Sequence, residues 1–553
     1  MKRIISLILS LVIIAGLLIG CAGKSGTGEK TTTPTNSQNV EKANTNKTSS
    51  GDSDLPENFN AVGFPIVNEK ITLSLFSVKA PIQGDWEEMP FWKEMEKLTN
   101  ISFTFDLASP DSLAERKNLL LASGDYPDIF YGASISADEE LTYGSQGIFV
   151  DLNDLIEKYA PNIKIYFEQN PVYKGMTLAP DGNWYTLPYI TLAPRDTVAT
   201  KLWVNNEWLR NLNMEIPKTI DDYYNMLKAF KEKDPNQNGK ADEIPMSFSQ
   251  SQLSMTRGAI LAAYGVMYRG INFDVKDGKV FFIPTSEPYK RYIMFMNKLY
   301  EEGLLDPESF TQTQQQYVSK GNQSLIGSFA NLASYIVDTM ENYPKYTAIP
   351  PLTSDLNSEQ IWPSTYPIYT GQFAITDKNK YAEASIRWVD YFFTEEGGAF
   401  MNQGPEGLGW KYIDEERKMW EKIIPEGYAS SEEYRGTLTP NCGTSTPGVV
   451  SSKFLLGLNA AHVVNLEEQI AKAYLPYMKD SFPMVKFTAK EQEEVATLST
   501  DIEKYVGQME ARFITGDISI DKWDEYVENL KKMNVDRLTE LYQVAYDRFS
   551  SAK

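Results

Sequence analysis

The chain has 553 residues, of which 42% are hydrophobic and 12% aromatic, so it is long and apolar enough for more than one packed domain. Its formal net charge of −21 disfavours binding to nucleic acid and adsorption to anionic lipid, because both depend on clustered Lys and Arg. One His and two Cys argue against His-based catalysis, a multi-His metal site and a disulfide framework.

The N-terminus is typical of an export signal. Met1-Lys2-Arg3 is basic, and the apolar run from Ile4 to Ile19 is shorter than the ~20 residues of a membrane-spanning helix. It ends in Leu18-Ile19-Gly20-Cys21, which matches the bacterial lipobox, where the Cys thiol receives a diacylglycerol. We therefore predict a signal peptide at 1–20 and lipidation of Cys21, which place the protein on the extracytoplasmic face of a Gram-positive cell membrane. The alternative is an ordinary signal peptide with a chance Cys.

Residues 21–56 have the composition of a disordered tether. Thr, Ser, Asn, Gly and Lys dominate this segment, and it has almost no apolar side chains. Such a segment cannot offset the entropy that ordering would cost. Because the signal peptide carries Lys2 and Arg3 and no acids, the mature chain has a formal net charge of −23.

The first part of the folded chain alternates strands with helices. Strands are predicted at 70–76, 101–105 and 126–131, and helices at 86–98 and 114–122. This order favours a parallel α/β sheet, in which right-handed crossovers bring the carboxyl ends of the strands to one ligand-binding rim.

The later part of the chain is mainly helical, with strand character returning twice. We predict helices at 220–231, 286–302 and 381–393, and strands at 324–329 and 368–375. Three helices follow at the C-terminus: the first begins with the capping-box sequence Thr488 to Glu491, and the others span 521–532 and 536–549. The return of α/β character near residue 370 indicates that the chain leaves one lobe and comes back to it.

A loop at 234–243 has the spacing of a calcium site. Oxygen-bearing side chains stand at loop positions 1, 3, 5 and 9, and Gly239 occupies position 6, where an EF-hand loop turns sharply. Position 12 departs from that pattern, because Pro245 stands there instead of Glu, and Glu243 is the expected substitute. We predict a structural Ca²⁺; the alternative is a solvated turn. The predicted ligands are Asp234, Asn236, Asn238, Lys240 through its main-chain carbonyl, Asp242 and Glu243.

Several aromatic residues stand in turn-like sequence next to Gly and Pro. Aromatic rings stack on sugar faces while nearby polar groups hold the hydroxyls. Core packing is the competing interpretation for each ring. No carboxylate pair, nucleophile motif or nucleotide-binding motif stands out, so we assign no catalytic residue. The predicted ligand-binding residues are Trp184, Tyr185, Phe329 at a strand end, Trp362, Tyr366, Glu406 and Trp410.

Taken together, these features resemble the extracellular solute-binding lipoproteins of ATP-binding-cassette sugar importers, and especially the large oligosaccharide-binding group that includes alginate-binding and LipO-like proteins. The resemblance covers about residues 65–553. It is carried by the segments 121–128, 146–152, 159–162, 234–245 and 523–548.

The resemblance implies an α/β fold of two lobes joined by hinge strands, with a helical C-terminal region. It places 57–190 plus 350–400 in the N-terminal lobe and 191–349 plus 401–553 in the C-terminal lobe. It further implies a non-enzymatic, monomeric receptor that delivers an oligosaccharide to a permease. The acidic body disfavours uronate-rich ligands such as alginate. The alternatives are a lipid-anchored hydrolase or lyase, and a receptor for a non-sugar solute.

Overall fold

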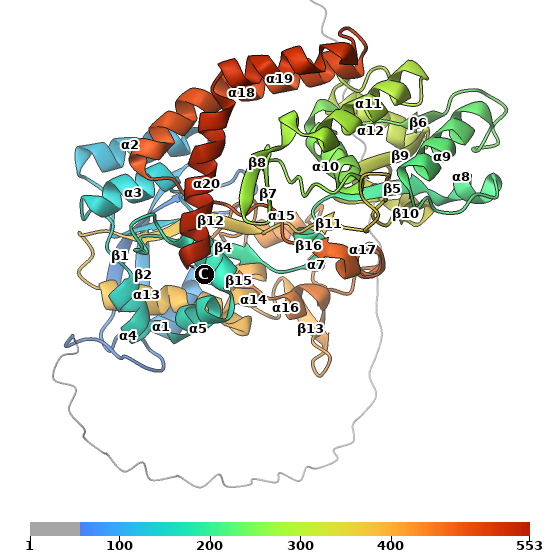
Figure 1. The fold of residues 1–553 in the computed structure, drawn as a ribbon. Helices are drawn as coiled ribbons and strands as arrows, with labels where there is room; N and C mark the ends of the chain where they lie inside the picture. The colour runs from blue at the N-terminus through green and yellow to red at the C-terminus, as the bar shows by residue number, and fades with distance from the viewer. Residues whose placement is uncertain (1–55, 553) are drawn as a thin grey trace, which may run out of the picture. The chain divides into compact units, whose positions relative to one another are not determined.

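The computed structural model describes residues 56–552 and contains two larger β-sheets, each with its own hydrophobic core (Figure 1). We call the part around the six-stranded sheet the first lobe and the part around the four-stranded sheet the second lobe. The predicted signal peptide, Cys21 and all but the last residue of the predicted tether lie outside the described residues.

The six-stranded sheet of the first lobe begins as predicted. Strands β1 and β2 pair in parallel from Ile71 opposite Ile101, and β1 pairs in parallel with β3 from Leu75 opposite Ile129. The next strand, β12, is antiparallel to both β3 and β4, so β4 runs in the same direction as β1 to β3. The strands in order across the sheet are β15 (Gly448–Val450), β4 (Leu187–Thr191), β12 (Ile368–Ile375), β3 (Ile129–Tyr131), β1 (Ile71–Val78) and β2 (Ile101–Ala108).

Helices pack around this sheet and bury large aromatic side chains. Trp388, on a helix predicted from its apolar spacing, is fully buried between Trp92 and Phe392. The helices of the first lobe are α1 (Pro90–Thr99), α2 (Leu113–Ser123), α3 (Ala137–Ser145), α4 (Asn153–Tyr159), α5 (Pro161–Gln169), α6 (Pro171–Thr177), α13 (Ala382–Asp390), α14 (Glu395–Gln403), α15 (Ser431–Gly436) and α16 (Ser452–Leu456), with the hairpin β13 (Trp410–Asp414) and β14 (Met419–Lys422).

The second lobe is built on four short strands. Their order is β10 (Tyr346–Ala348), β5 (Lys201–Asn205), β9 (Ile326–Asn331) and β6 (Ile244–Met246). Every residue of β5 and β9 is buried, which explains why these strands lack polar–apolar alternation. Around them lie α8 (Asn206–Asn211), α9 (Ile220–Glu232), α10 (Leu253–Ala263), α11 (Glu287–Glu301), α12 (Gln314–Asn322) and α17 (Ala461–Ala473), with the hairpin β7 (Phe273–Lys276) and β8 (Lys279–Phe282).

The chain passes between the two cores at three places before the C-terminal helices. The first passage follows β4 and contains the short helix α7 (Pro194–Thr197), the second lies between β10 and β12, and the third lies between β15 and α17. The second passage contains β11 (Trp362–Pro363), which pairs in parallel with β16 (Met478–Lys479). These three passages fit the two-lobe architecture that was predicted.

The C-terminal region is helical, as predicted, and contacts both lobes. It consists of α18 (Ala489–Ile514), α19 (Trp523–Lys532) and α20 (Val535–Ala552), drawn in orange to red in Figure 1. Thr488 and Glu491 form the predicted capping box at the start of α18. Helix α18 packs on α11 of the second lobe, whereas α20 reaches α6 and places Phe549 in the core of the first lobe.

Three sequence predictions need correction. The helix predicted at 86–98 begins at Pro90, because proline lacks an N–H and suits the first turn, and Trp86 packs in the core instead. The strand predicted at 126–131 begins at Ile129. The segment 401–460 belongs to the first lobe rather than the second, because β15 pairs with β4 and Trp410 and Trp420 lie in the first core.

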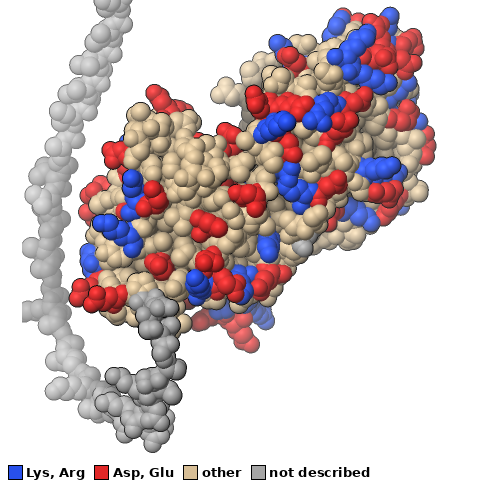
Figure 2. Space-filling model, turned by 60° about the vertical axis from the view of Figure 1, so that its left-hand side comes forward, with Lys and Arg blue, Asp and Glu red and all other residues tan. Residues whose placement is uncertain are grey.

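The surface is of mixed charge on the face shown in Figure 2, where Lys and Arg lie among Asp and Glu and form no broad basic area. Among residues 56–552, no helix has both the length and the hydropathy to cross a membrane.

Candidate functional site

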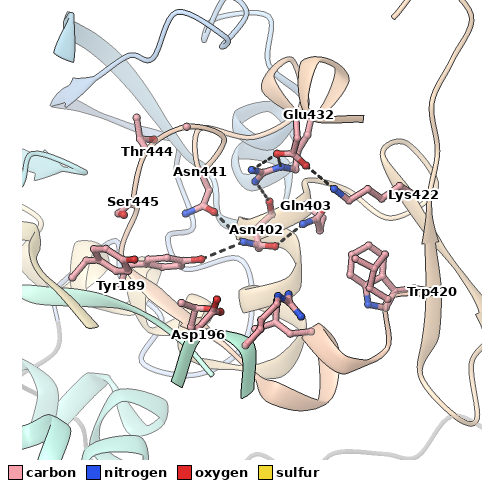
Figure 3. A pocket seen from close by; sticks show the side chains of 17 residues that line it. Tyr189, Asp196, Asn402, Gln403, Trp420, Lys422, Glu432, Asn441, Thr444 and Ser445 are labelled. Atoms are coloured by element: carbon pink, nitrogen blue, oxygen red, sulfur yellow. Dashed lines mark hydrogen bonds and ion pairs between the residues drawn. The ribbon is translucent and has the colours of Figure 1, made fainter. Parts of the chain in front are cut away.

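A cavity of about 460 Å³ lies where β4 ends and the first passage to the second lobe begins (Figure 3). The loop 441–446 closes one side of it and lies over the end of β3, since a side chain at Gly132 would meet the carbonyl of Ser445. The cavity therefore lies at the rim that holds the carboxyl ends of the parallel strands. The residues that line it are Tyr189, Thr191, Arg195, Asp196, Tyr369, Asn402, Gln403, Trp420, Lys422, Glu432, Arg435, Asn441, Gly443, Thr444, Ser445, Leu455 and Leu458.

Two tyrosines from neighbouring strands give this pocket an aromatic wall. The rings of Tyr189 on β4 and Tyr369 on β12 lie 5.8 Å apart, and 51% of Tyr369 is exposed. Burial raises the pKa of Tyr189 to about 12, so its hydroxyl stays protonated near neutral pH. Trp420 also lines the pocket but is almost fully buried, because its ring stacks on Phe454 at 4.7 Å. Tyr369 is thus the ring that a bound molecule can cover.

Three buried amides form the floor of the pocket and are joined in one chain of hydrogen bonds (Figure 3). Gln403 donates to Asn402 at 2.6 Å, Asn402 donates to Asn441 at 3.1 Å, and Asn441 donates to Thr446 at 3.0 Å. Asn402 also donates to the hydroxyl of Tyr189 at 3.3 Å. These bonds fix uncharged donors and acceptors in defined positions, which is the chemistry that recognises hydroxyl groups.

A salt-bridge triad covers another side of the pocket. Glu432 accepts from Lys422 at 2.6 Å through one oxygen and from Arg435 at 2.7 Å through the other. Burial alone would raise the pKa of the Glu432 carboxyl. Arg435 and Lys422 together outweigh burial and lower this pKa to about 2. Arg435 further donates to the carbonyl of Asn402 and so joins the triad to the amide chain.

The first passage between the lobes contains a second cluster of charges. Arg195, on α7, pairs with Glu467 of α17 at 2.6 Å, and Asp196 accepts from Thr191 at 2.7 Å. Lys201 at the start of β5 donates to the carbonyl of Arg195 at 2.8 Å. Burial lowers the pKa of Lys201 to about 7, against the opposing effect of Asp196 and Glu467. Arg195 in the pocket wall is thus bonded directly to α17 and β5 of the second lobe.

None of the seven residues predicted to bind ligand lines this pocket. Most of them are buried in a hydrophobic core. Their rings pack against other aromatic side chains, and the indole N–H groups of the tryptophans donate to nearby oxygens. Trp184 donates to Thr177, Trp362 donates to the carbonyl of Thr200, and Phe329 is fully buried.

The remaining four predicted residues lie elsewhere. Tyr185 is buried and bonds to Asp181, and Tyr366 lies under the guanidinium of Arg269. Glu406 and Trp410 come together, since they line a separate cavity of about 490 Å³ on the first lobe.

Sequence reasoning missed the residues that do line the pocket. Tyr189 and Tyr369 lie in strands rather than turns, and Asn402 lies in the last turn of α14. The one usable signal was Asn441 to Thr446, a run of small, mostly polar residues between Pro440 and Pro447.

The predicted cation loop is a tight turn of oxygen-bearing side chains. Asp234 accepts from the backbone N–H groups of Asn238 and Gly239, and the amides of Asn236 and Asn238 donate to Asp242. Gly239 has a φ of 75°, as the predicted sharp turn requires. Among residues 56–552, no group of three or more His, Cys, Asp or Glu side chains is arranged to hold a metal.

One atom in the loop lacks a hydrogen-bond partner. The Oε1 atom of Glu243 is buried, and no described residue donates to it. Burial also raises the pKa of Glu243, and the neighbouring Asp242 and Asp234 add to this. The loop therefore has an oxygen-rich donor set with an unsatisfied carboxylate oxygen, which is a set that suits a hard cation.

Comparison with known proteins identifies the architecture. The family model described as bacterial extracellular solute-binding protein matches residues 80–399, more than half of the chain. The fructooligosaccharide ABC transporter substrate-binding protein FusA of Streptococcus pneumoniae serotype 4 is 27% identical over 514 residues, which are 89% of this chain and 93% of FusA.

Two proteins of Bacillus subtilis are also similar. The polygalacturonan/rhamnogalacturonan-binding protein YtcQ is 23% identical over 82% of this chain and 87% of its own length. Lipoprotein LipO is 25% identical over 62% of this chain and 68% of its own length.

Solved structures agree with the sequence comparison. The structure of S. pneumoniae FusA with kestose superposes with a TM-score of 0.69 and 26% identity, over 87% of this chain and 100% of FusA. An EF-hand mutant of FusA with fructo-nystose superposes with a TM-score of 0.68 and the same identity and coverage. The chain therefore belongs to the family of bacterial extracellular solute-binding proteins.

Proposed function

We propose that the protein is the receptor of an ABC importer, and that it binds an oligosaccharide in the pocket beside β4 and delivers it to permease subunits. The observation that carries this proposal is the similarity to FusA, which extends over 89% of the chain. The protein performs no chemistry in this proposal: binding energy is used to bring the lobes together around the sugar. The comparisons favour neither of the two alternatives, a hydrolase or lyase and a non-sugar receptor.

The pocket has the groups that a sugar requires. Tyr369 offers an exposed ring for stacking, and the amide chain from Gln403 to Asn441 offers fixed hydrogen-bond partners. A volume of about 460 Å³ is within the range of small-molecule sites. Because the pocket adjoins α7, a ligand bound there lies beside the first passage between the lobes.

A Ca²⁺ ion in the loop at 234–243 is part of the proposal. The EF-hand of FusA supports it, as does the unsatisfied Oε1 of Glu243. Asp234, Asn236, Asn238, Asp242 and Glu243 would hold the ion with the carbonyl of Lys240. Its role is structural, because a cation enclosed by protein oxygens tightens the connection between α9 and β6.

We also propose that the mature protein is a monomer held at the cell surface by a lipid on Cys21. The lipobox at 18–21 and the similarity to lipoprotein LipO support the anchor. In this arrangement residues 22–56 space the folded body from the membrane.

Titration calorimetry with kestose, nystose and maltotriose tests the proposed function. We expect at least one neutral oligosaccharide to bind with micromolar or tighter affinity, and Tyr369→Ala to weaken that binding at least tenfold. Tyr381→Ala is the matched control, because Tyr381 is an exposed first-lobe tyrosine that does not line the pocket. Hydrolysis of the sugar over hours, abolished by Glu406→Gln, would instead establish an enzyme.

A further inference from the structure

We infer that the pocket selects uncharged oligosaccharides and rejects those that carry uronate groups. This inference rests on the proposed function and concerns the class of ligand at the same site. FusA and YtcQ differ in this property: the fructooligosaccharide in the name of FusA is neutral, whereas the polygalacturonan in the name of YtcQ carries a carboxylate on each sugar. Similarity alone therefore leaves the charge of the ligand open, and the charges that line the pocket decide it.

Two of the three cations that line the pocket are committed to one carboxylate. One carboxylate oxygen of Glu432 pairs with Lys422, and the other pairs with Arg435. Arg435 donates to Glu432 from both Nε and Nη2, and its Nη1 donates to the carbonyl of Asn402. The Nε–Nη2 edge of the guanidinium is therefore occupied by Glu432 and Nη1 by a main-chain carbonyl, so every nitrogen of Arg435 already has a partner before a ligand binds.

The third cation is committed as well. Arg195 pairs with Glu467, and both side chains are largely buried, at 22% and 10% exposure. Asp196, next to Arg195 in the pocket wall, accepts from Thr191, and no cation of the described residues lies within ion-pair distance of it. Among the lining residues and their ion-pair partners, three cations are balanced by three carboxylates, so the pocket lining offers no excess positive charge. Buried Lys201 lies behind this lining and donates to the main-chain carbonyl of Arg195.

A uronate would enter this pocket at an electrostatic disadvantage. It would lose part of its hydration and approach the carboxylates of Asp196 and Glu432, without an unpaired cation among the lining residues to compensate. A neutral sugar meets no such repulsion, because it carries no charge. The uncharged amides of Asn402, Gln403 and Asn441 line the pocket and suit its hydroxyl groups. The carboxylates of Asp196 and Glu432 thus disfavour an anionic ligand and have little effect on a neutral one.

The inference is tested by comparing neutral and anionic sugars of equal length on the full mature protein. Kestose, maltotriose and galactotriose serve as neutral probes and trigalacturonate as the anionic probe, in titration calorimetry at 50 and 500 mM salt. We expect the best neutral probe to bind at least 100-fold more tightly than trigalacturonate. Its affinity should change less than twofold with salt, because no charge pair forms on binding.

The variant Glu432→Gln tests the electrostatic cause. It frees Lys422 and Arg435 from their shared carboxylate, so we expect trigalacturonate to gain at least tenfold in affinity, lost again at 500 mM salt, with a neutral probe shifted less. Glu421→Gln is the matched control: it makes the same change in charge beside Lys422 on β14, at an exposed pair with Lys411 outside the pocket. Thermal melting of both variants shows that each one folds.

The possible results separate the inference from the proposed function. Trigalacturonate binding as tightly as the neutral sugars would overturn the inference and leave an oligosaccharide receptor intact. Glu432→Gln folding normally without any gain for trigalacturonate would likewise overturn it. No binding of any probe at 1 mM would count against the proposed function itself.

Discussion

The buried lysine beside the pocket makes the stability of the protein depend on pH. Lys201 is 1% exposed, and burial lowers its pKa to about 7 in the folded protein from 10.5. Between these two values the unfolded chain holds one more proton than the folded one, so the free energy of unfolding rises with pH. Integrated from pH 7 to 8.5, the gain is about 1.6 kcal/mol at 1.36 kcal/mol per pKa unit. For a body of this length that raises Tm by about 1.5 °C.

Differential scanning calorimetry of the wild type and Lys201→Met across this range measures the effect. The window avoids Asp390, whose pKa burial raises to about 6, and Cys442, whose pKa burial raises above 9.0. Lys201→Met should lose the rise in Tm between pH 7 and 8.5, while Lys472→Met, at an exposed position on α17, should keep it. An equal rise in the wild type and Lys201→Met would refute the reasoning, because some other group would then carry the proton.

Three further predictions concern the loop, the second core and the anchor. Ca²⁺ at about 100 times its Kd should stabilise the wild type by about 3 kcal/mol. In scanning fluorimetry Asp234→Ala should melt at the same temperature with Ca²⁺ and with chelator. A difference that persists in this variant would count against Ca²⁺ binding by the loop. Phe329→Ala should destabilise the second lobe by about 3–5 kcal/mol in urea; weaker sugar binding with unchanged stability would instead make Phe329 a ligand contact. Cys21→Ser should move the protein from the membrane fraction to the medium, and its retention in the membrane would contradict lipid anchoring.

Local elements could be predicted from the sequence where one short-range pattern dominates. The alternation in β1 and β2, the apolar spacing of α11 and α18, and the capping box at Thr488 each depend on neighbours within a few residues. Strand β15 shows the limit of such patterns. It has three residues, and nothing in Gly448 to Val450 says that it pairs with β4 rather than with a strand of the second sheet. Its lobe depends on a partner more than 250 residues away.

The pocket escaped prediction for the same physical reason. Tyr189 and Asn402 are hydrogen-bonded across 213 residues of sequence, and the two tyrosines of the wall come from strands that are neighbours only in the folded sheet. A turn-like sequence context also misleads about burial. Trp184 follows Gly182 and Asn183 in a turn, yet its ring packs on Phe167 and its indole N–H bonds to Thr177. Local sequence tells where the chain turns, whereas burial depends on which surface packs against that turn.

The arrangement around α7 links the proposed ligand pocket to the second lobe through a few side chains. Arg195 lines the pocket, pairs with Glu467 of α17, and accepts Lys201 of β5 on its carbonyl. Arg195 and Asp196 are themselves part of the segment that joins the lobes. A ligand that contacts either residue therefore contacts this segment directly. The charge balance has a second consequence here: an anionic ligand would compete with Glu467 for Arg195 and so loosen the bond between the pocket and α17. A neutral ligand leaves that bond in place, which suits a receptor whose bound form must hold the two lobes together.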